Sequence, residues 1–352
     1  ASGEQVTSGL LALTLQAMGC KARSWLGWQL PVKTFSAHAN ARVGEIDAPR
    51  LRESMAAGEI AVIPGFQGVS DEGRITTMGR GGSDTSAVAI AAAVGADRCD
   101  IYTDVDGVYT TDPRIVARAR KIPYVSYEEM LELASVGAKV LQTRSVSLAM
   151  KHNVRVQVLS SFVEEGAPSA DTLPGTMIVS EEEMQKILED SNMERQSVTG
   201  IAHDKNEARV VLTRVPDKPG AVANIFTPLG EAGINVDMIV QNISHDDNAT
   251  DLTFTLPMAD LERAIATLEG KRGELNFAEL RADKNVAKIS VIGVGMRSHA
   301  GVAQRMFTTL AEKGINIQVI STSEIKVSVL IAEEYTELAV RALHTAYGLD
   351  AD

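Results

Sequence analysis

The chain has 352 residues, of which 45% are hydrophobic and 23% charged; this ordinary globular composition leaves room for two or three domains and excludes a disordered chain. Its 46 acidic residues outnumber its 34 basic residues, and the net charge of −12 argues against nucleic acid or an anionic membrane as a partner. Cys20 and Cys99 lie far apart, so they predict neither a disulfide scaffold nor a zinc site, and His38 and His245 have no partner at metal-ligand spacing. We expect a cytoplasmic protein with reduced thiols and no membrane span.

Residues 1–19 predict a helix. Apolar residues recur at helical spacing from Val6 to Met18, and Gly19 stands where a helix C-cap glycine belongs. Because an α/β domain normally places a strand before such a helix, we expect that preceding sequence is missing from the chain. Processing of the N-terminus is the alternative.

A glycine-rich turn, GRGGSDTSA, separates two strand-like runs, a buried one at 60–63 and another at 101–105. Ser83 and Asp84 are expected at the N-cap of the Ala-rich helix that follows, and the alternation of strand, loop and helix predicts a layered α/β domain. Backbone N–H groups at such a helix start can hold an anion. The turn alone is a weak signal, but Arg80 beside Asp84 strengthens it, because a cation and a carboxylate next to an anion cradle suit charge-transfer chemistry.

Further along, we expect a helix from Tyr127, a second helix from Ala138, and a strand at 154–159. Lys139 would begin the second helix, where its charge opposes the helix dipole, and by itself it is interpreted as a solvated lysine. Residues 164–175 are rich in Pro, Gly and acid, which indicates a linker, and a charged helical segment follows.

An internal repeat occupies the last third of the chain. The segments that begin at Gly220 and Gly301 match at a constant offset of 81 residues, and each ends in Gly-Ile-Asn. Each copy combines a strand, a helix ending at glycine, two further strands and a second helix. The pattern predicts two βαββα modules, each with one sheet face that can pair with another module, and it favours ligand sensing over a second active site.

The ordered motifs GRGGSDTSA, IYTDVDGVYTTDPR, SYEEMLELASVGAKVL, PDKPG…GIN…QN and GIN…STSEI resemble those of aspartate kinases, from about Ser2 to Gly348. The resemblance implies a layered α/β, carbamate-kinase-like amino-acid kinase domain at 1–163 that lacks its N-terminal part. A linker at 164–197 and two α+β ACT modules at 198–285 and 286–352 would follow. The family's opening Lys-Phe/Tyr-Gly-Gly-Thr motif has no counterpart here, which puts the activity of this chain in question.

The resemblance implies transfer of the γ-phosphate of ATP to the side-chain carboxylate of L-aspartate, with Mg²⁺ on the phosphates. Arg80 and Asp84 would be catalytic, with Arg80 holding a substrate carboxylate. Substrate binding would involve Glu4, Arg80, Gly81, Gly82 and Ser83. Nucleotide binding would involve Ser83, Thr103, Asp104, Tyr109, Arg114 and Lys139, which reverses the interpretation of Lys139 from its position alone. Asp106 and Asp112 are left as solvated residues of an acidic loop.

In the repeat half, the resemblance implies feedback regulation by lysine, threonine or both. The matching effector positions are Asp217, Gly220, Gln241, Asn242, Asn316, Ile317 and Ser323. A purely structural alternative is that the glycines begin helices and the asparagines form turns. The expected assembly is a homo-oligomer, or a complex with a shorter regulatory chain through paired ACT modules.

Two other functions remain open. The first is an amino-acid sensor without kinase activity, favoured by the absent opening motif. The second is another amino-acid kinase, such as glutamate 5-kinase, against which the tandem repeat and the setting of Arg80 both argue. Acyl-phosphate formation from ATP and aspartate would separate the three.

Overall fold

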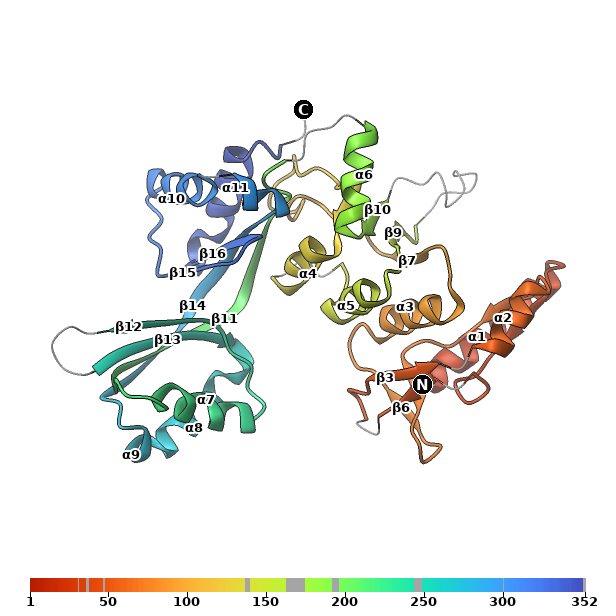
Figure 1. Ribbon diagram of the computed structural model, residues 1–352, viewed down its shortest axis with the longest axis horizontal. Coiled ribbons are helices and arrows are strands. Elements are labelled where there is room, and N and C mark those ends of the chain that lie inside the picture. Colours follow the sequence, from red (N-terminus) through yellow and green to blue (C-terminus); the bar gives the residue numbers. More distant parts are fainter. Residues whose placement is uncertain are drawn as a thin grey trace. The chain divides into compact units, whose positions relative to one another are not determined.

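The computed structural model describes residues 1–30, 32–35, 38–46, 48–136, 140–162, 175–191, 196–243, 249–299 and 301–350. These residues divide into two compact units (Figure 1). The first unit comprises 1–108 and 121–195, and the second comprises 109–120 and 196–352. Among the described residues, no helix combines the length and the apolar character needed to cross a bilayer.

The first unit is a layered α/β structure with three sheets. The parallel pair β1-β4 stands by itself, and the other two sheets have the strand orders β3-β2-β5-β6 and β7-β9-β10-β8. The strands are β1 (Ala22–Ser24), β2 (Val32–Thr34), β3 (Val43–Ile46), β4 (Ile60–Val62), β5 (Gln67–Val69), β6 (Ile75–Thr77), β7 (Cys99–Thr103), β8 (Tyr124–Ser126), β9 (Val156–Ser160) and β10 (Thr176–Val179). The helices are α1 (Ser2–Ala17), α2 (Pro49–Ala56), α3 (Gly82–Val94), α4 (Tyr127–Ser135), α5 (Thr143–His152) and α6 (Glu181–Ser191).

Helix α1 confirms the helix expected at the start of the chain, and Gly19 follows it with φ +85°. Its buried residues are Ser8 and Ala12, however, whereas Val6 and Leu10 of the apolar pattern are about 60% exposed. Small side chains on the inner face let the helix approach β1 and β4 closely. Strand β4 is also less buried than expected, since Ile60 is 45% exposed.

Three expectations for the first unit need correction. The N-cap of α3 is Gly81 in the left-handed region, without a side-chain cap, rather than Ser83 or Asp84. The linker expected at 164–197 contains β10, which pairs with both β9 and β8 inside a sheet, whereas α6 confirms the charged helical segment expected after residue 175. The helix expected from Ala138 begins at Thr143, and Ala138 itself lies outside the described residues.

Helix α4 begins as expected at Tyr127, and a capping box explains why. The Ser126 side chain accepts a hydrogen bond from the Glu129 N–H, and the Glu129 carboxylate accepts one from the Ser126 N–H. These two bonds satisfy orphan donors at the helix start. The local sequence therefore determined this helix boundary.

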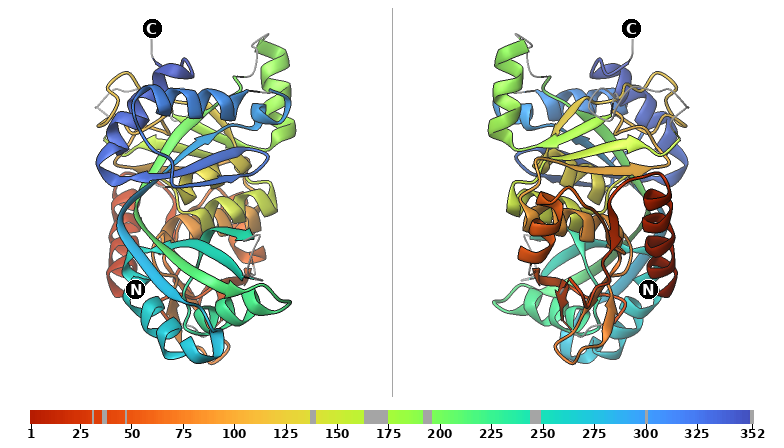
Figure 2. Two further views of the ribbon diagram at one scale, coloured as in Figure 1. Left: turned by 90° about the vertical axis from the view of Figure 1, so that its left-hand side faces the viewer. Right: turned by 90° about the vertical axis from the view of Figure 1, so that its right-hand side faces the viewer.

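The second unit is built on one six-stranded sheet with the order β12-β13-β11-β14-β16-β15. Its long strands β11 (Gly200–Pro216) and β14 (Glu279–Ile292) run through both modules (Figure 2). The other strands are β12 (Asp237–Ile243), β13 (Ala249–Pro257), β15 (Val319–Thr322) and β16 (Lys326–Ala332). The helices are α7 (Ala221–Glu231), α8 (Leu261–Gly270), α9 (Arg272–Leu275), α10 (Val302–Glu312) and α11 (Thr336–Ala346), with 3₁₀ turns at Met258–Asp260, Val294–Ser298 and Glu333–Tyr335.

The two βαββα modules predicted from the repeat are both present. In the first, α7 and α8 pack on a core that includes Phe254, and in the second, α10 and α11 pack on a core that includes Val329. The edge strands β12 and β15 lie against each other, and Met238 and Val319 from these strands belong to a third apolar cluster. Each module therefore has its own core, and a third, smaller apolar cluster lies where their edge strands meet.

A buried ion cluster also joins the two modules. The Lys288 ammonium on β14 lies 2.7 Å from the Asp237 carboxylate on β12 and also pairs with the Glu207 carboxylate on β11. Lys288 and Glu207 are each about 5% exposed. Despite its burial, the pKa of Lys288 is raised, because two carboxylates stabilise its charged form.

Residues 109–120 belong to the second unit although the sequence suggested that they continue the first domain. Val116 is buried in the core of the second module, and Ile115 packs against that core. Ala119 forms an isolated β-bridge with Asp350. Local sequence gave no sign of this because the segment reads as an acidic loop.

Candidate functional site

The glycine-rich turn between β6 and α3 has a geometry that only glycine allows. Gly79 and Gly81 have φ angles of +78° and +63°, in the left-handed region. A Cβ atom on Gly81 would lie 2.0 Å from Cγ of Gln142, and one on Gly82 would lie 2.8 Å from the Phe66 ring. The turn is therefore packed tightly between the start of α5 and the loop that follows β4.

Arg144 on α5 holds the backbone next to this turn by hydrogen bonds. Its guanidinium donates hydrogen bonds to the backbone carbonyl of Met78, at 3.0 Å, and to that of Ala41. Burial lowers the pKa of Arg144, with a further contribution from Arg42. Arg144 was not among the residues expected from the sequence; the available signal was a basic side chain in the first turn of a helix, where the dipole disfavours it.

The N-terminus of α3 presents Arg80, Ser83 and Asp84. Arg80 and Ser83 are exposed, while Asp84 is partly buried. Burial is the main cause that raises the pKa of Asp84, and a backbone hydrogen bond lowers it in part. The positive end of the helix dipole and the outward N–H groups make this helix start suitable for an anion.

Two adjacent residues at the end of the β4–β5 loop and the start of β5 link helix α1 to helix α3. The Gln5 side chain, next in the chain to Glu4, donates a hydrogen bond to the side chain of Gln67 on β5 at 2.8 Å. In the loop just before it, the Phe66 N–H donates to Oγ of Ser86 on α3 at 2.8 Å. The structure thus brings the first turn of α1, which carries Glu4, and the glycine turn to one loop.

The positions expected to bind nucleotide lie in both units. In the first unit, Thr103 ends β7 and Asp104 follows it, and the Thr103 carbonyl accepts hydrogen bonds from the backbone and side chain of Ser161. Tyr109 and Arg114 belong to the second unit. Lys139 lies outside the described residues.

The expectation that Asp106 and Asp112 are merely solvated is wrong, because each carboxylate has a basic partner. Asp106 pairs with Lys121 at 2.9 Å. Asp112 accepts the Arg114 guanidinium through both oxygens and also accepts its backbone N–H, which lowers the pKa of Asp112. The charged Asp112 side chain therefore orients the Arg114 head group.

The effector positions lie on the second unit. Asp217 and Gly220 form the exposed turn before α7, and Gly220 caps that helix with φ +88°. Gln241 and Asn242 are exposed on β12, whereas the remaining three flank the neighbouring edge strand β15: Asn316, Ile317 and Ser323. Gly301 likewise caps α10. Gly220 and Gly301 therefore each begin a helix, as the structural alternative expected.

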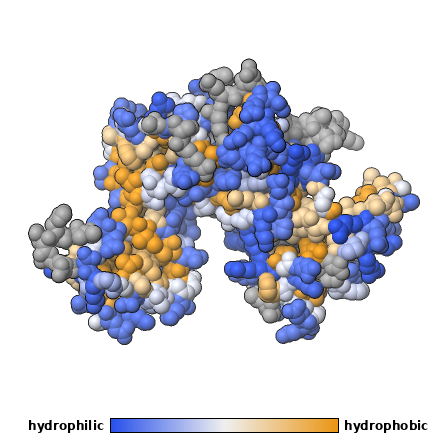
Figure 3. Space-filling model, in the orientation of Figure 1, coloured by the Kyte–Doolittle hydropathy of each residue, from blue (hydrophilic) through white to orange (hydrophobic). Residues whose placement is uncertain are grey.

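An apolar patch lies on the same edge strands. Ile239 on β12 is 51% exposed and Ile320 on β15 is 45% exposed. Figure 3 shows apolar surface gathered over this part of the second unit. Exposed apolar side chains on edge strands favour pairing with another chain.

Family models, relatives and solved structures all match this chain to aspartate kinases or their domains. Residues 1–160 match the amino acid kinase family, and residues 209–270 and 289–347 each match an ACT domain. An aspartate kinase of Stutzerimonas stutzeri is 53% identical over 99% of this chain and 81% of its own. The crystal structure of Escherichia coli aspartokinase III with aspartate and ADP (R-state) has a TM-score of 0.77 at 25% identity, covering 98% of this chain and 74% of that one. The same enzyme with lysine and aspartate (T-state) gives 0.72 at 26% identity, covering 97% and 73%.

Proposed function

The chain belongs to the aspartate kinase family, and from that premise we propose that it transfers the γ-phosphoryl group of ATP to the β-carboxylate of L-aspartate. The product is 4-phospho-L-aspartate, and the reaction opens the synthesis of lysine, threonine and methionine. The single observation that carries the proposal is the glycine turn with Arg80 and Asp84 at the start of α3, tied through one loop to the first turn of α1. The site would lie in the cytoplasm, where ATP is available.

The difficulty of the reaction is that two anions must approach each other. Arg80 would hold a carboxylate of aspartate by paired hydrogen bonds, and Glu4 would receive its ammonium group. The backbone N–H and hydroxyl of Ser83 would bind phosphate oxygens at the positive end of α3. The Gly82 N–H already donates to the Gly79 carbonyl at 3.1 Å, so Gly81 and Gly82 would act by letting the substrate approach the backbone closely. A β-carboxylate oxygen then attacks the γ-phosphorus, the bond from that phosphorus to the bridging oxygen breaks, and ADP leaves with the electron pair.

Thr103, Asp104, Tyr109, Arg114 and Lys139 would hold the nucleotide. Arg114 is an exposed guanidinium that the Asp112 carboxylate orients, as a phosphate-side cation requires. The described residues contain no group of three or more His, Cys, Asp or Glu side chains that could hold a metal ion. Such a site fits a Mg²⁺ ion held mainly by phosphate oxygens and water, which when bound would neutralise phosphate charge.

Trapping with hydroxylamine tests the proposal. The protein is incubated with MgATP, L-aspartate and hydroxylamine, and aspartyl hydroxamate is measured. We expect product with aspartate and none with glutamate, and loss of product in Arg80→Ala with folding intact. Product with glutamate alone would instead indicate a glutamate kinase. Absence of product while lysine or threonine still binds would indicate a sensor without kinase activity.

The second unit would bind lysine, threonine or both as inhibitors. The proposal is supported by polar side chains on and beside two adjacent edge strands, Gln241 and Asn242 on one side and Asn316 and Ser323 on the other. The apolar patch on β12 and β15 supports self-association, or association with a shorter regulatory chain, through these modules. Sedimentation with and without lysine tests the assembly, and a monomer under both conditions would contradict it.

A further inference from the structure

The segment 109–120 leaves the first unit after Val108 and returns to it at Lys121, and between these points it is part of the second unit. It carries Tyr109 and Arg114, two of the proposed nucleotide contacts. The hydrogen bonds that hold this segment at Thr110, Ile115 and Arg120 come from residues of the second unit. The regulatory half of the chain therefore positions Tyr109 and Arg114.

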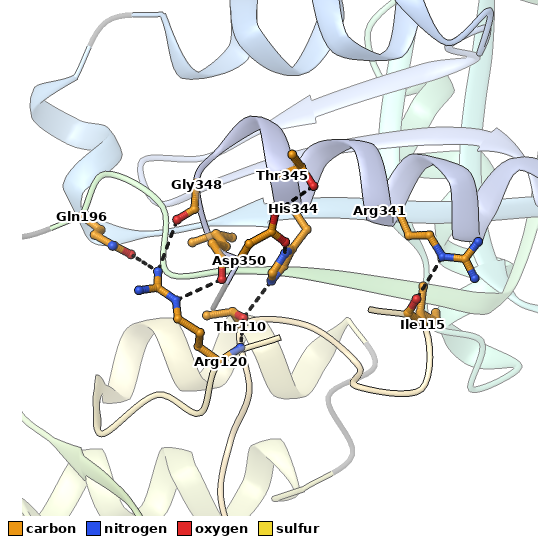
Figure 4. A network of polar contacts seen from close by, with 10 residues as sticks. Thr110, Ile115, Arg120, Gln196, Arg341, His344, Thr345, Gly348 and Asp350 are labelled. Atoms are coloured by element: carbon orange, nitrogen blue, oxygen red, sulfur yellow. Dashed lines mark hydrogen bonds and ion pairs between the residues drawn. The ribbon is translucent and has the colours of Figure 1, made fainter. Parts of the chain in front are cut away.

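A buried hydrogen-bond chain holds the segment at Thr110 (Figure 4). Oγ1 of Thr110 lies 2.8 Å from Nε2 of His344, and Nδ1 of His344 lies 2.9 Å from Oδ1 of Asp350. His344 is on α11 and is fully buried, and Thr110 is 5% exposed. A buried polar chain of this kind contributes only in one arrangement, so it selects one position for the segment.

The direction of each bond follows from the chemistry of its partners. The pKa of Asp350 is lowered by its hydrogen bond from His344, so this carboxylate is ionised and only accepts, and Nδ1 must donate. Burial lowers the pKa of His344, so the ring is neutral and Nε2 accepts. The Thr110 hydroxyl therefore donates to Nε2, while its oxygen accepts the Arg120 N–H at 3.0 Å.

Other contacts close the segment at both ends. The Arg120 guanidinium donates to the Leu349 carbonyl at 3.0 Å, and the Arg341 guanidinium on α11 donates to the Ile115 carbonyl at 3.0 Å, one residue after Arg114 (Figure 4). The Ile201 N–H on β11 donates to the Thr110 carbonyl at 2.7 Å. Strand β11 and helix α11, both in the second unit, thus each form hydrogen bonds with the segment.

We propose that Thr110 and His344 are positioning residues for ATP: they fix segment 109–120 on the second ACT module and thereby set the position of Tyr109 and Arg114. Neither side chain touches substrate, and each acts through the segment. The inference rests on the proposed function, because it takes these two residues as nucleotide contacts.

The test compares Thr110→Val, which keeps the shape but removes the hydroxyl, with Thr110→Ser, which restores it. Thr110→Val is expected to raise KM for ATP and Kd for MgADP about tenfold, as loss of one buried hydrogen bond implies, with KM for aspartate within about twofold of wild type. Thr110→Ser is expected to keep both constants. Ser328→Ala is the matched control, since it removes a buried 2.7 Å hydrogen bond with Ser290 in the same unit without touching the segment.

Unchanged ATP and MgADP constants in Thr110→Val would overturn the inference. So would an equal rise in Ser328→Ala, or an equal rise of KM for both substrates. If Thr110→Val does not fold, Asp350→Ala decides, because Asp350 is near the surface; it must weaken MgADP binding severalfold, and no change overturns the inference. Calorimetric titration of MgADP needs no turnover, so a wild-type protein that forms no hydroxamate refutes the proposed function while the inference is still tested.

Discussion

Substitution of Gly81 by alanine probes the glycine turn most directly. The left-handed φ of +63° disfavours a residue with a Cβ by about 1–2 kcal/mol. The new Cβ would also lie 2.0 Å from Cγ and 2.7 Å from Cβ of Gln142, too close for the side chain alone to relieve, which adds an overpacking cost of about 1–3 kcal/mol. Gly81→Ala is therefore expected to lose about 2–5 kcal/mol of unfolding free energy.

Gly95→Ala is the matched control. Gly95 ends the same helix with φ +70°, but nothing lies within 4 Å of its Cβ position, so only the backbone cost of about 1–2 kcal/mol applies. Urea unfolding measures both variants, and the hydroxamate assay measures activity. We expect Gly81→Ala to lose activity, because α5 must shift away from the turn, and Gly95→Ala to keep it.

The double variant Gly81→Ala/Gln142→Gly separates strain from clash. Gln142 makes no side-chain cap bond to α5, and removing its side chain eliminates every close contact found for the new Cβ. Its stability should return to that of Gly95→Ala. A Gly81→Ala variant as stable as Gly95→Ala, or a double variant that does not recover, would contradict a clash with Gln142.

Three further outcomes are expected. Burial raises the pKa of Asp84, so its ionisation costs stability as the pH rises through that pKa. Asp84→Asn should therefore raise the urea midpoint at pH 7, leave it unchanged near pH 3 and lower kcat about 100-fold. A midpoint shift that is equal at both pH values would contradict this. Lys288→Met leaves two carboxylates unpaired and should lower the unfolding free energy, measured by chemical denaturation, by about 3–5 kcal/mol. Lys284→Met, at an exposed ion pair, should lower it by at most about 1 kcal/mol, and equal losses would be evidence against the buried cluster. Gln241→Ala should weaken inhibition by lysine or threonine about tenfold with KM for ATP unchanged, and an unaltered inhibition curve would remove Gln241 from the effector site.

The sequence predicted well wherever a few neighbouring residues decide the conformation. The capping box at Ser126 and Glu129 determined the start of α4, and the glycine at position 19 marked the end of α1. The 81-residue repeat correctly predicted two modules with the same order of elements, because each module forms its own core from its own pattern.

Errors arose where distant parts of the chain compete for the same space. Gly81, not Ser83 or Asp84, caps α3, because the side chain of Gln142 and the backbone carbonyls bound by Arg144 require the turn to close two residues before Ser83. Residues 176–179 appeared to be part of a linker, yet they complete a sheet whose other strands are formed before them in the chain.

By itself the sequence determined the class of each half and the residues that carry charge, since motifs, helix caps and apolar periodicity are local properties. Only the tertiary structure decided that residues 109–120 belong to the second unit, that His344 lies buried between Thr110 and Asp350, and that Lys288 neutralises two carboxylates from other strands. Each depends on contacts between residues far apart in the chain. Burial is what makes each such polar contact selective, and burial is a property of the fold rather than of any segment.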